Sequence, residues 1–189
     1  EILRFADQEV DLRTNPPGTG IITGTPAGDE ITGSPGADVI FGAAGADEIN
    51  GLGGNDIIFG EAGNDNIVWD APNGGYDIVA GGGNGDGTGD VDMVTINADG
   101  TETAITMYTV AAWTGAGGAA PIDPLSEIII TRTVDGVETA IMEIRGIEEV
   151  TINGVAGTEV ISAIGDFTQT SLAPNTIFVN GTAGDEVID

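Results

Sequence analysis

The chain has 189 residues, with 31 Asp and Glu against 4 Lys and Arg, and its net charge is -27. Nucleic acid and anionic membranes are poor partners for such a surface. Cysteine and histidine are both absent, which excludes disulfides, thiolate metal sites and imidazole ligands or bases. Oxygen ligands remain, and these suit hard cations such as calcium.

The start of the sequence and its apolar runs bear on whether the chain is part of a longer protein and whether it enters a membrane. It opens with Glu1 rather than Met, so we expect an excised or processed piece with neighbouring domains in a longer parent chain. No apolar run approaches the roughly 18 residues that cross a bilayer, and no basic-apolar leader opens the chain. We therefore expect no membrane insertion.

A nine-residue repeat begins at Gly24 and ends at Val68, reading GTPAGDEIT, GSPGADVIF, GAAGADEIN, GLGGNDIIF and GEAGNDNIV. Its six Gly-rich residues ending in Asp favour a tight turn, and the three residues around a central Ile favour a short strand. Two repeats would close one coil of 18 residues. Successive coils would then stack as two parallel sheets with the Ile side chains between them.

The same period predicts two rows of carboxylates, because repeats two apart stack on the same side. Asp29, Asp47 and Asp65 would line one edge, and Asp38 and Asp56 the other. A cation between stacked turns would receive Asp oxygens and backbone carbonyl oxygens, which approach the six or more oxygens that calcium prefers. Asp and Gly also populate ordinary turns, but an ordinary turn does not require Asp at one position in five consecutive repeats.

The register breaks after Val68, where WDAPNGGYDIVA carries three extra residues. The next expected Asp is then Asp77, followed nine residues later by Asp86, with Asp90 and Asp92 as weaker candidates. We extend the stacked coils to about residue 97 on this basis.

These repeats resemble the RTX, or haemolysin-type, calcium-binding nonapeptide G-G-x-G-x-D-x-U-x. The resemblance implies a parallel β-roll in which the lower turn gives carbonyls from its second and fourth positions, and the upper turn from its first and third. One site would combine Thr25, Ala27 and Asp29 with Gly42, Ala44 and Asp47. The predicted metal ligands are the carboxylates of Asp29, Asp38, Asp47, Asp56, Asp65, Asp77 and Asp86, and the backbone carbonyls of Thr25, Ala27, Ser34, Gly36, Gly42, Ala43, Ala44, Gly45, Gly51, Gly53, Gly60 and Ala62.

Outward strand positions differ between the two expected sheets. One sheet presents an apolar stripe of Val39, Phe41, Ile57, Phe59, Ile78 and Ala80. Apolar stripes of this kind are seldom left in water, so we expect the later part of this chain or a neighbouring domain to cover it.

Residues 98–180 lack the strict period but remain rich in β-formers. TAITMYTV, SEIIITRTV, VETAIMEI, EEVTIN and NTIFV favour strands, and Asp135-Gly136 predicts a hairpin turn. The expected class is all-β, a parallel β-roll with a β-rich extension that contains a hairpin. The expected boundaries are 1–20 for a capping end of a preceding block, 21–97 for the roll, 98–180 for an extension stacked on or packed against it, and 181–189 for the start of a further repeat block.

The predicted function is a Ca²⁺-binding module that folds on binding calcium outside the cell, within a larger secreted bacterial protein, and that is not an enzyme. Its expected partners are Ca²⁺ and neighbouring domains of the parent chain. The resemblance implies type I secretion, and it leaves open a calcium-stiffened spacer of an adhesin, or an accessory region of a secreted haem peroxidase or polysaccharide-active enzyme. Some RTX proteins cleave an Asp-Pro bond of their own chain, whereas Asp123-Pro124 here favours a simple turn.

Overall fold

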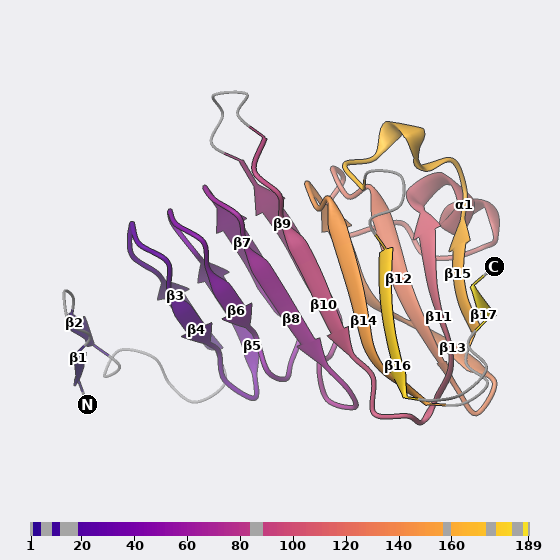
Figure 1. Cartoon of the computed structure of the whole chain (residues 1–189), viewed down its shortest axis with the longest axis horizontal. Helices are drawn as coiled ribbons and strands as arrows, with labels where there is room; N and C mark the ends of the chain where they lie inside the picture. Colours follow the sequence, from indigo (N-terminus) through magenta and orange to yellow (C-terminus); the bar gives the residue numbers. More distant parts are fainter. Residues whose placement is uncertain are drawn as a thin grey trace.

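The computed structural model describes residues 2–4, 9–11, 19–83, 89–156, 160–172, 177–182 and 187–188. Near the N-terminus, β1 (Ile2–Arg4) and β2 (Glu9–Asp11) pair as a short antiparallel sheet. From β3 onward the described strands form two larger sheets, and successive coils stack from the N-terminal to the C-terminal side of the molecule (Figure 1).

The smaller of these two sheets has six strands, and every strand pair in it is parallel. Their order across the sheet is β4 (Glu30–Thr32), β6 (Glu48–Asn50), β8 (Asn66–Asp70), β10 (Met93–Asn97), β14 (Glu149–Ala156) and β16 (Ile177–Thr182).

The larger sheet has nine strands. Their order is β3 (Thr19–Thr23), β5 (Ala37–Phe41), β7 (Ile57–Glu61), β9 (Asp77–Gly82), β13 (Val137–Arg145), β12 (Ile128–Val134), β11 (Glu102–Thr109), β15 (Val160–Ile164) and β17 (Val187–Ile188). In the roll the chain alternates between the two sheets, which confirms the predicted all-β parallel roll.

The register of the roll follows the predicted coil length. Ile31 pairs with Ile49, Ile49 pairs with Ile67, and Ile40 pairs with Ile58, each 18 residues apart. These Ile side chains point between the sheets and are almost completely buried. Later turns are longer, yet Ile67 still pairs with Val94, because the inward apolar residues set the pairing and the extra residues remain in the turn.

Beyond the roll, an antiparallel meander enters the larger sheet. β11 pairs with β12 and β12 pairs with β13 in antiparallel fashion, while β13 rests parallel on β9 and β11 rests parallel on β15. The predicted hairpin is confirmed: Asp135 and Gly136 have φ values of 52° and 76° and join β12 to β13. Positive φ at both central residues is the requirement of a type I′ hairpin turn.

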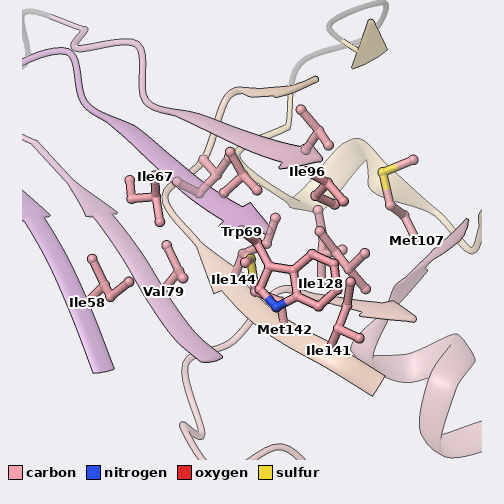
Figure 2. Packing of buried hydrophobic residues seen from close by; sticks show 14 of the residues in the cluster. Ile58, Ile67, Trp69, Val79, Ile96, Met107, Ile128, Ile141, Met142 and Ile144 are labelled. Atoms are coloured by element: carbon pink, nitrogen blue, oxygen red, sulfur yellow. The ribbon is translucent and has the colours of Figure 1, made fainter. Parts of the chain in front are cut away.

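Large side chains fill the core where the meander enters. Trp69 of β8 lies among the side chains of the meander strands, with only 2% of its surface exposed (Figure 2). Its Nε1 donates to the carbonyl of Gly75 at 3.3 Å, and the guanidinium of Arg132 lies 5.3 Å from the ring centroid. The main cluster members at this end are Met107, Ile128, Ile130, Ile141, Met142, Ile144 and Leu172.

Helical structure among the described residues is short and peripheral. α1 (Val110–Gly115) follows β11, and the hydroxyl of Thr109 caps its N-terminus by accepting the N–H of Ala112. A 3-10 turn, η2 (Phe167–Gln169), leads to Leu172. Within the described parts of the chain, neither helix has the length and apolar content that a membrane crossing requires.

The apolar stripe lies on the outer face of the larger sheet. Val39, Ile57 and Ile78 form one row, and Phe41 stacks on Phe59 with ring centroids 5.1 Å apart. These side chains are half-buried, and Ile21 at the edge of the same sheet is 69% exposed. The described residues therefore cover this stripe only in part.

Candidate metal centre

Two rows of buried carboxylates run along the corners of the roll. The first row lies in the turns that lead from the larger sheet to the smaller one, and it contains Asp29, Asp47, Asp65 and Asp92. The second row lies where the opposite turns lead into the larger sheet, and it contains Asp38 in β5, Asp56 just before β7 and Asp77 at the start of β9. Apart from Asp29 in the first described turn of its row, these residues are at most 3% exposed.

One oxygen of each stacked carboxylate is used by the backbone. The N–H of Asp29 donates to Oδ1 of Asp47 at 2.8 Å, and the N–H of Asp47 donates to Oδ1 of Asp65 at 2.9 Å. The opposite corner repeats the contact, with the N–H of Asp38 donating to Oδ1 of Asp56 at 2.8 Å and the N–H of Asp56 to Oδ1 of Asp77 at 3.0 Å. The Asp of the motif therefore joins each turn to the turn one coil earlier.

The second oxygen is buried without a protein partner in three of these residues. Oδ2 of Asp47, Asp56 and Asp65 is inaccessible to solvent and has no hydrogen-bond partner. Burying a carboxylate oxygen without a compensating interaction is costly, because the charge has lost its hydration. A cation, or a proton, is needed at each of these oxygens.

The first glycine of a repeat lets a carboxylate oxygen and a carbonyl oxygen lie close to the backbone at the corner. A Cβ atom on Gly42 would lie 2.6 Å from Oδ2 of Asp47 and 2.5 Å from the carbonyl oxygen of Gly60. A Cβ on Gly51 would collide with Oδ2 of Asp56 in the same way. Any side chain at this position would fill the cradle between the carboxylate of one turn and the carbonyl of the next. The oxygen-only donor set fits a hard cation.

The predicted carbonyls divide into groups in the structure. The carbonyls of Gly42, Gly51 and Gly60 lie near the carboxylate of the turn one coil earlier. The first glycine of that earlier repeat lies between the carbonyl and the carboxylate. Those of Thr25, Ala43 and Ala62 accept N–H groups of stacked turns, and those of Ala27 and Gly36 accept hydroxyls of Thr25 and Ser34. The carbonyls of Ser34, Ala44, Gly45 and Gly53 belong to the same turns.

Burial also changes the acidity of the rows. Desolvation raises the pKa of Asp47 and Asp56 to about 6, and the backbone N–H bonds oppose this shift. It raises the pKa of Asp77 to about 8 and that of Asp92 to about 7. The neighbouring carboxylates add to the upward shifts, so Asp77 and Asp92 retain protons near neutral pH when no cation balances them.

The first row continues at Asp92, which the sequence offered as a weaker candidate than Asp86. Asp86 lies outside the described residues, and Asp92 takes the place next to Asp65, whose N–H donates to Oδ1 of Asp92 at 2.9 Å. The signal in the sequence was the pair Met93-Val94 after Asp92, since Val94 provides the inward apolar residue that Asp86 lacks.

Sequence reasoning missed Glu148 entirely. The N–H of Asp92 donates to Oε2 of Glu148 at 2.9 Å, so this glutamate continues the row in the short turn between β13 and β14. The turn has no nonapeptide pattern, and only the apolar Val150 two residues later resembles the repeat. In the described parts of the chain no three acidic side chains converge on one point.

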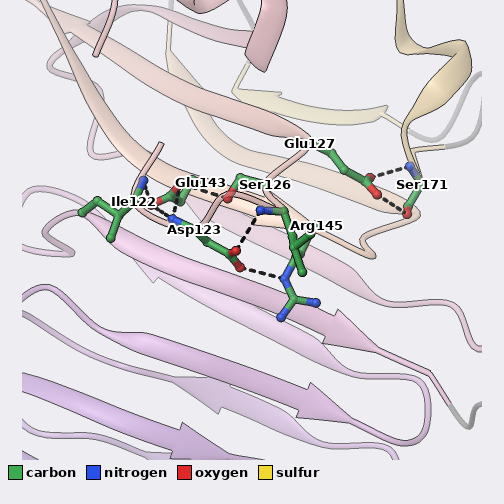
Figure 3. A network of polar contacts seen from close by, with 8 residues as sticks. Ile122, Asp123, Ser126, Glu127, Glu143, Arg145 and Ser171 are labelled. Carbon is green, nitrogen blue, oxygen red and sulfur yellow. Dashed lines mark hydrogen bonds and ion pairs between the residues drawn. The ribbon is translucent and has the colours of Figure 1, made fainter. Parts of the chain in front are cut away.

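A separate polar network holds the loop before β12 against the larger sheet (Figure 3). The fully buried carboxylate of Glu143 accepts the N–H of Ile122 at 3.0 Å and the hydroxyl of Ser126 at 2.9 Å. Asp123 accepts Nε of Arg145 at 2.8 Å and the N–H of Leu125 at 2.9 Å. The Asp123-Pro124 bond thus lies in a hydrogen-bonded turn.

The family model of the RTX calcium-binding nonapeptide repeat, which spans four copies, matches residues 23–57 and, in a second placement, 32–67. No curated protein matches the chain. Residues 23–67 therefore carry RTX nonapeptide repeats, as the sequence predicts. Repeats of this kind bind calcium, form a structural rather than a catalytic module, and occur in secreted bacterial proteins.

Proposed function

We propose that residues 21–97 form a roll that folds when Ca²⁺ enters the cradles between its stacked turns. On this proposal the chain is a structural, secretion-linked region of a larger extracellular protein. The observation that carries the proposal is the set of buried, unpartnered Oδ2 atoms of Asp47, Asp56 and Asp65.

Each site would combine the turns of two stacked coils. At the corner of Asp47, its free Oδ2 and the carbonyl oxygen of Gly60 both lie close to Gly42, and Asp65 is stacked above. Carboxylates from both turns and the turn carbonyls give the flexible, all-oxygen shell that calcium accepts. Magnesium requires stricter octahedral geometry and retains its waters, so it fits this shell less well.

Calcium would control folding because the bare rows oppose it. Without a cation, stacked carboxylates are desolvated and repel one another, and each repeat contributes only one central Ile to the core. A ligand that binds only the folded state stabilises it by about 2.7 kcal/mol per site at 100 times its dissociation constant. Extracellular calcium modules bind at roughly 10⁻⁴ to 10⁻³ M, so the roll would fold outside the cell and not in the calcium-poor cytosol.

A calcium titration followed by far-UV circular dichroism tests this proposal. In chelator at pH 8 the expected spectrum shows reduced β content, and millimolar Ca²⁺ restores it cooperatively while the same concentration of Mg²⁺ does not. Full β content in chelator that calcium leaves unchanged contradicts the proposal.

A further inference from the structure

Buried polar side-chain atoms without a hydrogen-bond partner occur at two kinds of place among the described residues. Three are carboxylate oxygens at the corners of the roll, and the other three belong to one charged pair in the meander. These are Oε1 and Oε2 of Glu102 and Nη1 of Arg132. Nη1 lies 3.5 Å from Oε1, which is longer than the roughly 2.7–2.9 Å of a good charge-assisted hydrogen bond. The pair therefore has hydrogen-bonding capacity that the chain leaves unused.

Arg132 also lines a pocket between the β12–β13 hairpin and two loops, one after β8 and one before β11. The volume of this pocket is about 190 Å³, and its lining residues are Pro72, Thr101, Arg132, Val134, Val137 and Thr139. Three of them, Thr101, Val137 and Thr139, are exposed, so the pocket opens to solvent. Pockets for drug-sized ligands begin at roughly 300 Å³, so this one suits a single small unit of a ligand.

Two contacts hold the guanidinium of Arg132 at the wall of the pocket. Its Nη2 donates to the carbonyl of Pro72 at 3.1 Å, and its carbon lies 5.3 Å from the centroid of the Trp69 ring. The side chain still has 21% of its surface exposed. A guanidinium has five N–H donors in a fixed fork, so donors remain for a ligand that enters the pocket.

Two hydroxyls and an apolar wall complete the lining. The hydroxyl of Thr101 donates to Oδ1 of Asp99 at 2.6 Å, and its lone pairs can still accept. The hydroxyl of Thr139 has no partner within the described part of the chain. Val134 and Val137 flank the hairpin turn and provide the apolar wall. The pocket thus offers donors, acceptors and a surface for C–H groups within one small space.

The charges around the pocket favour a neutral ligand. Asp99 lies beside Glu102, so two carboxylates and one guanidinium give this place a negative formal charge. The chain as a whole has a net charge of -27, which opposes an anionic ligand. A cationic ligand would meet the guanidinium of Arg132 at the pocket wall. Ligand hydroxyls avoid both costs, because each can donate as well as accept.

We propose that this pocket binds one residue of a neutral saccharide. Hydroxyls of the sugar accept from the guanidinium of Arg132 and exchange hydrogen bonds with the hydroxyls of Thr101 and Thr139, while C–H groups of the ring lie on the valine wall. Glu102 is a positioning residue that balances the charge of Arg132 from behind. The site lies in the meander, outside the nonapeptide block, and it does not depend on cations between the turns of the roll.

NMR titration of the ¹⁵N-labelled chain in millimolar Ca²⁺ tests the site. The neutral probes are methyl α-D-glucopyranoside, methyl α-D-mannopyranoside and methyl β-D-galactopyranoside, and sodium acetate and methylammonium chloride are the anionic and cationic probes. At least one glycoside should shift the backbone amide signals of Thr101, Arg132 and Thr139 with saturation at millimolar concentrations. Acetate and methylammonium should leave these signals unchanged.

One variant and a matched control separate the pocket from general surface effects. Thr139→Val keeps the shape of an exposed side chain and removes one hydroxyl, so the affinity for the glycoside should fall about 2- to 10-fold. Thr32→Val makes the same change at an exposed position of the edge strand β4, and the affinity should equal that of the wild type. The amide spectrum of each variant shows whether it has kept the fold.

Three results would overturn the inference. The first is that no glycoside shifts the three amide signals of the wild type with saturation. The second is that acetate or methylammonium shifts them and the glycosides do not, and the third is that Thr139→Val binds the glycoside as tightly as Thr32→Val does. None of these results bears on calcium binding by the roll, so the proposed function would stand.

Discussion

Replacing Asp56 by Asn should change stability in opposite directions with and without calcium. Asp56 lies between Asp38 and Asp77 in its row, so it serves two of the proposed sites. Its Oδ1 accepts the N–H of Asp38 at 2.8 Å, and an Asn side chain can retain that bond. Only the charge and the free Oδ2 are lost.

The two directions have different magnitudes. With Ca²⁺ at 100 times the dissociation constant, each site contributes about 2.7 kcal/mol, so loss of both lowers the free energy of unfolding by up to about 5 kcal/mol. Without calcium at pH 8, Asp56 is ionised although burial raises its pKa to about 6. A neutral Asn removes that unfavourable charge, and the free energy of unfolding should rise on the order of 1 to 3 kcal/mol.

Urea unfolding in calcium measures the first value, and the folded fraction in chelator at pH 8 measures the second, with the fluorescence of buried Trp69 and far-UV circular dichroism as probes. Asp135→Asn is the matched control, because it removes one charge from an exposed turn in which Asn also adopts positive φ. Its effect should stay within about 0.5 kcal/mol in both conditions. If Asp56→Asn destabilises the protein equally with and without calcium, Asp56 is a structural turn residue and the reasoning is refuted.

Four further predictions concern pH and the polar contacts outside the roll. In chelator the protein should melt at a higher temperature at pH 5 than at pH 8. Burial raises the pKa of Asp77 to about 8 and the pKa of Asp92 to about 7 in the folded state. The stabilising proton uptake is therefore complete below the unfolded pKa of about 4, and it is lost as pH rises through the folded pKa values. The apparent calcium affinity, measured by isothermal titration, should rise over the same pH range, and a pH-independent affinity would contradict the competition between protons and calcium. Arg132→Met should lower the free energy of unfolding by about 3 kcal/mol with or without calcium, because it leaves the buried Glu102 carboxylate, 3.5 Å from the guanidinium, unpaired. Adding Glu102→Gln to this variant should recover part of the lost free energy. No recovery would argue against the ion pair. Glu143→Ala should release the loop at Ile122 and Ser126, so limited proteolysis should cut residues 119–126 faster than in the wild type. An unchanged cleavage rate would show that the network does not hold the loop.

Local periodicity explains how much of the fold was predictable. Where the spacing stays at 18 residues, as from Asp29 to Asp47, each apolar residue and each carboxylate has only one stacking partner available. The Asp135-Gly136 hairpin was predictable for a similar reason, since positive φ at two successive residues is a local requirement.

The remaining features depend on contacts that no local pattern encodes. A turn of different length moves the acid along the sequence but not in space, so a fixed count from Asp77 reaches Asp86 first and gives Asp92 only as a weaker candidate. The inward Val94 was the better guide, because burial of apolar side chains sets strand register. The meander in the larger sheet, and the pairing of Arg132 with Glu102, arise from strands that meet only after folding.

Hydrogen–deuterium exchange of the wild type, in calcium and in chelator, tests most directly whether cations hold the carboxylate rows together. The backbone N–H groups of Asp38 and Asp47 donate to the Oδ1 atoms of the next coil, so they report on these corners. The account predicts that peptides covering residues 19–70 exchange at least about 100-fold more slowly with Ca²⁺ than in chelator at pH 8, equivalent to about 2.7 kcal/mol. Equal protection of these peptides in both conditions would contradict it.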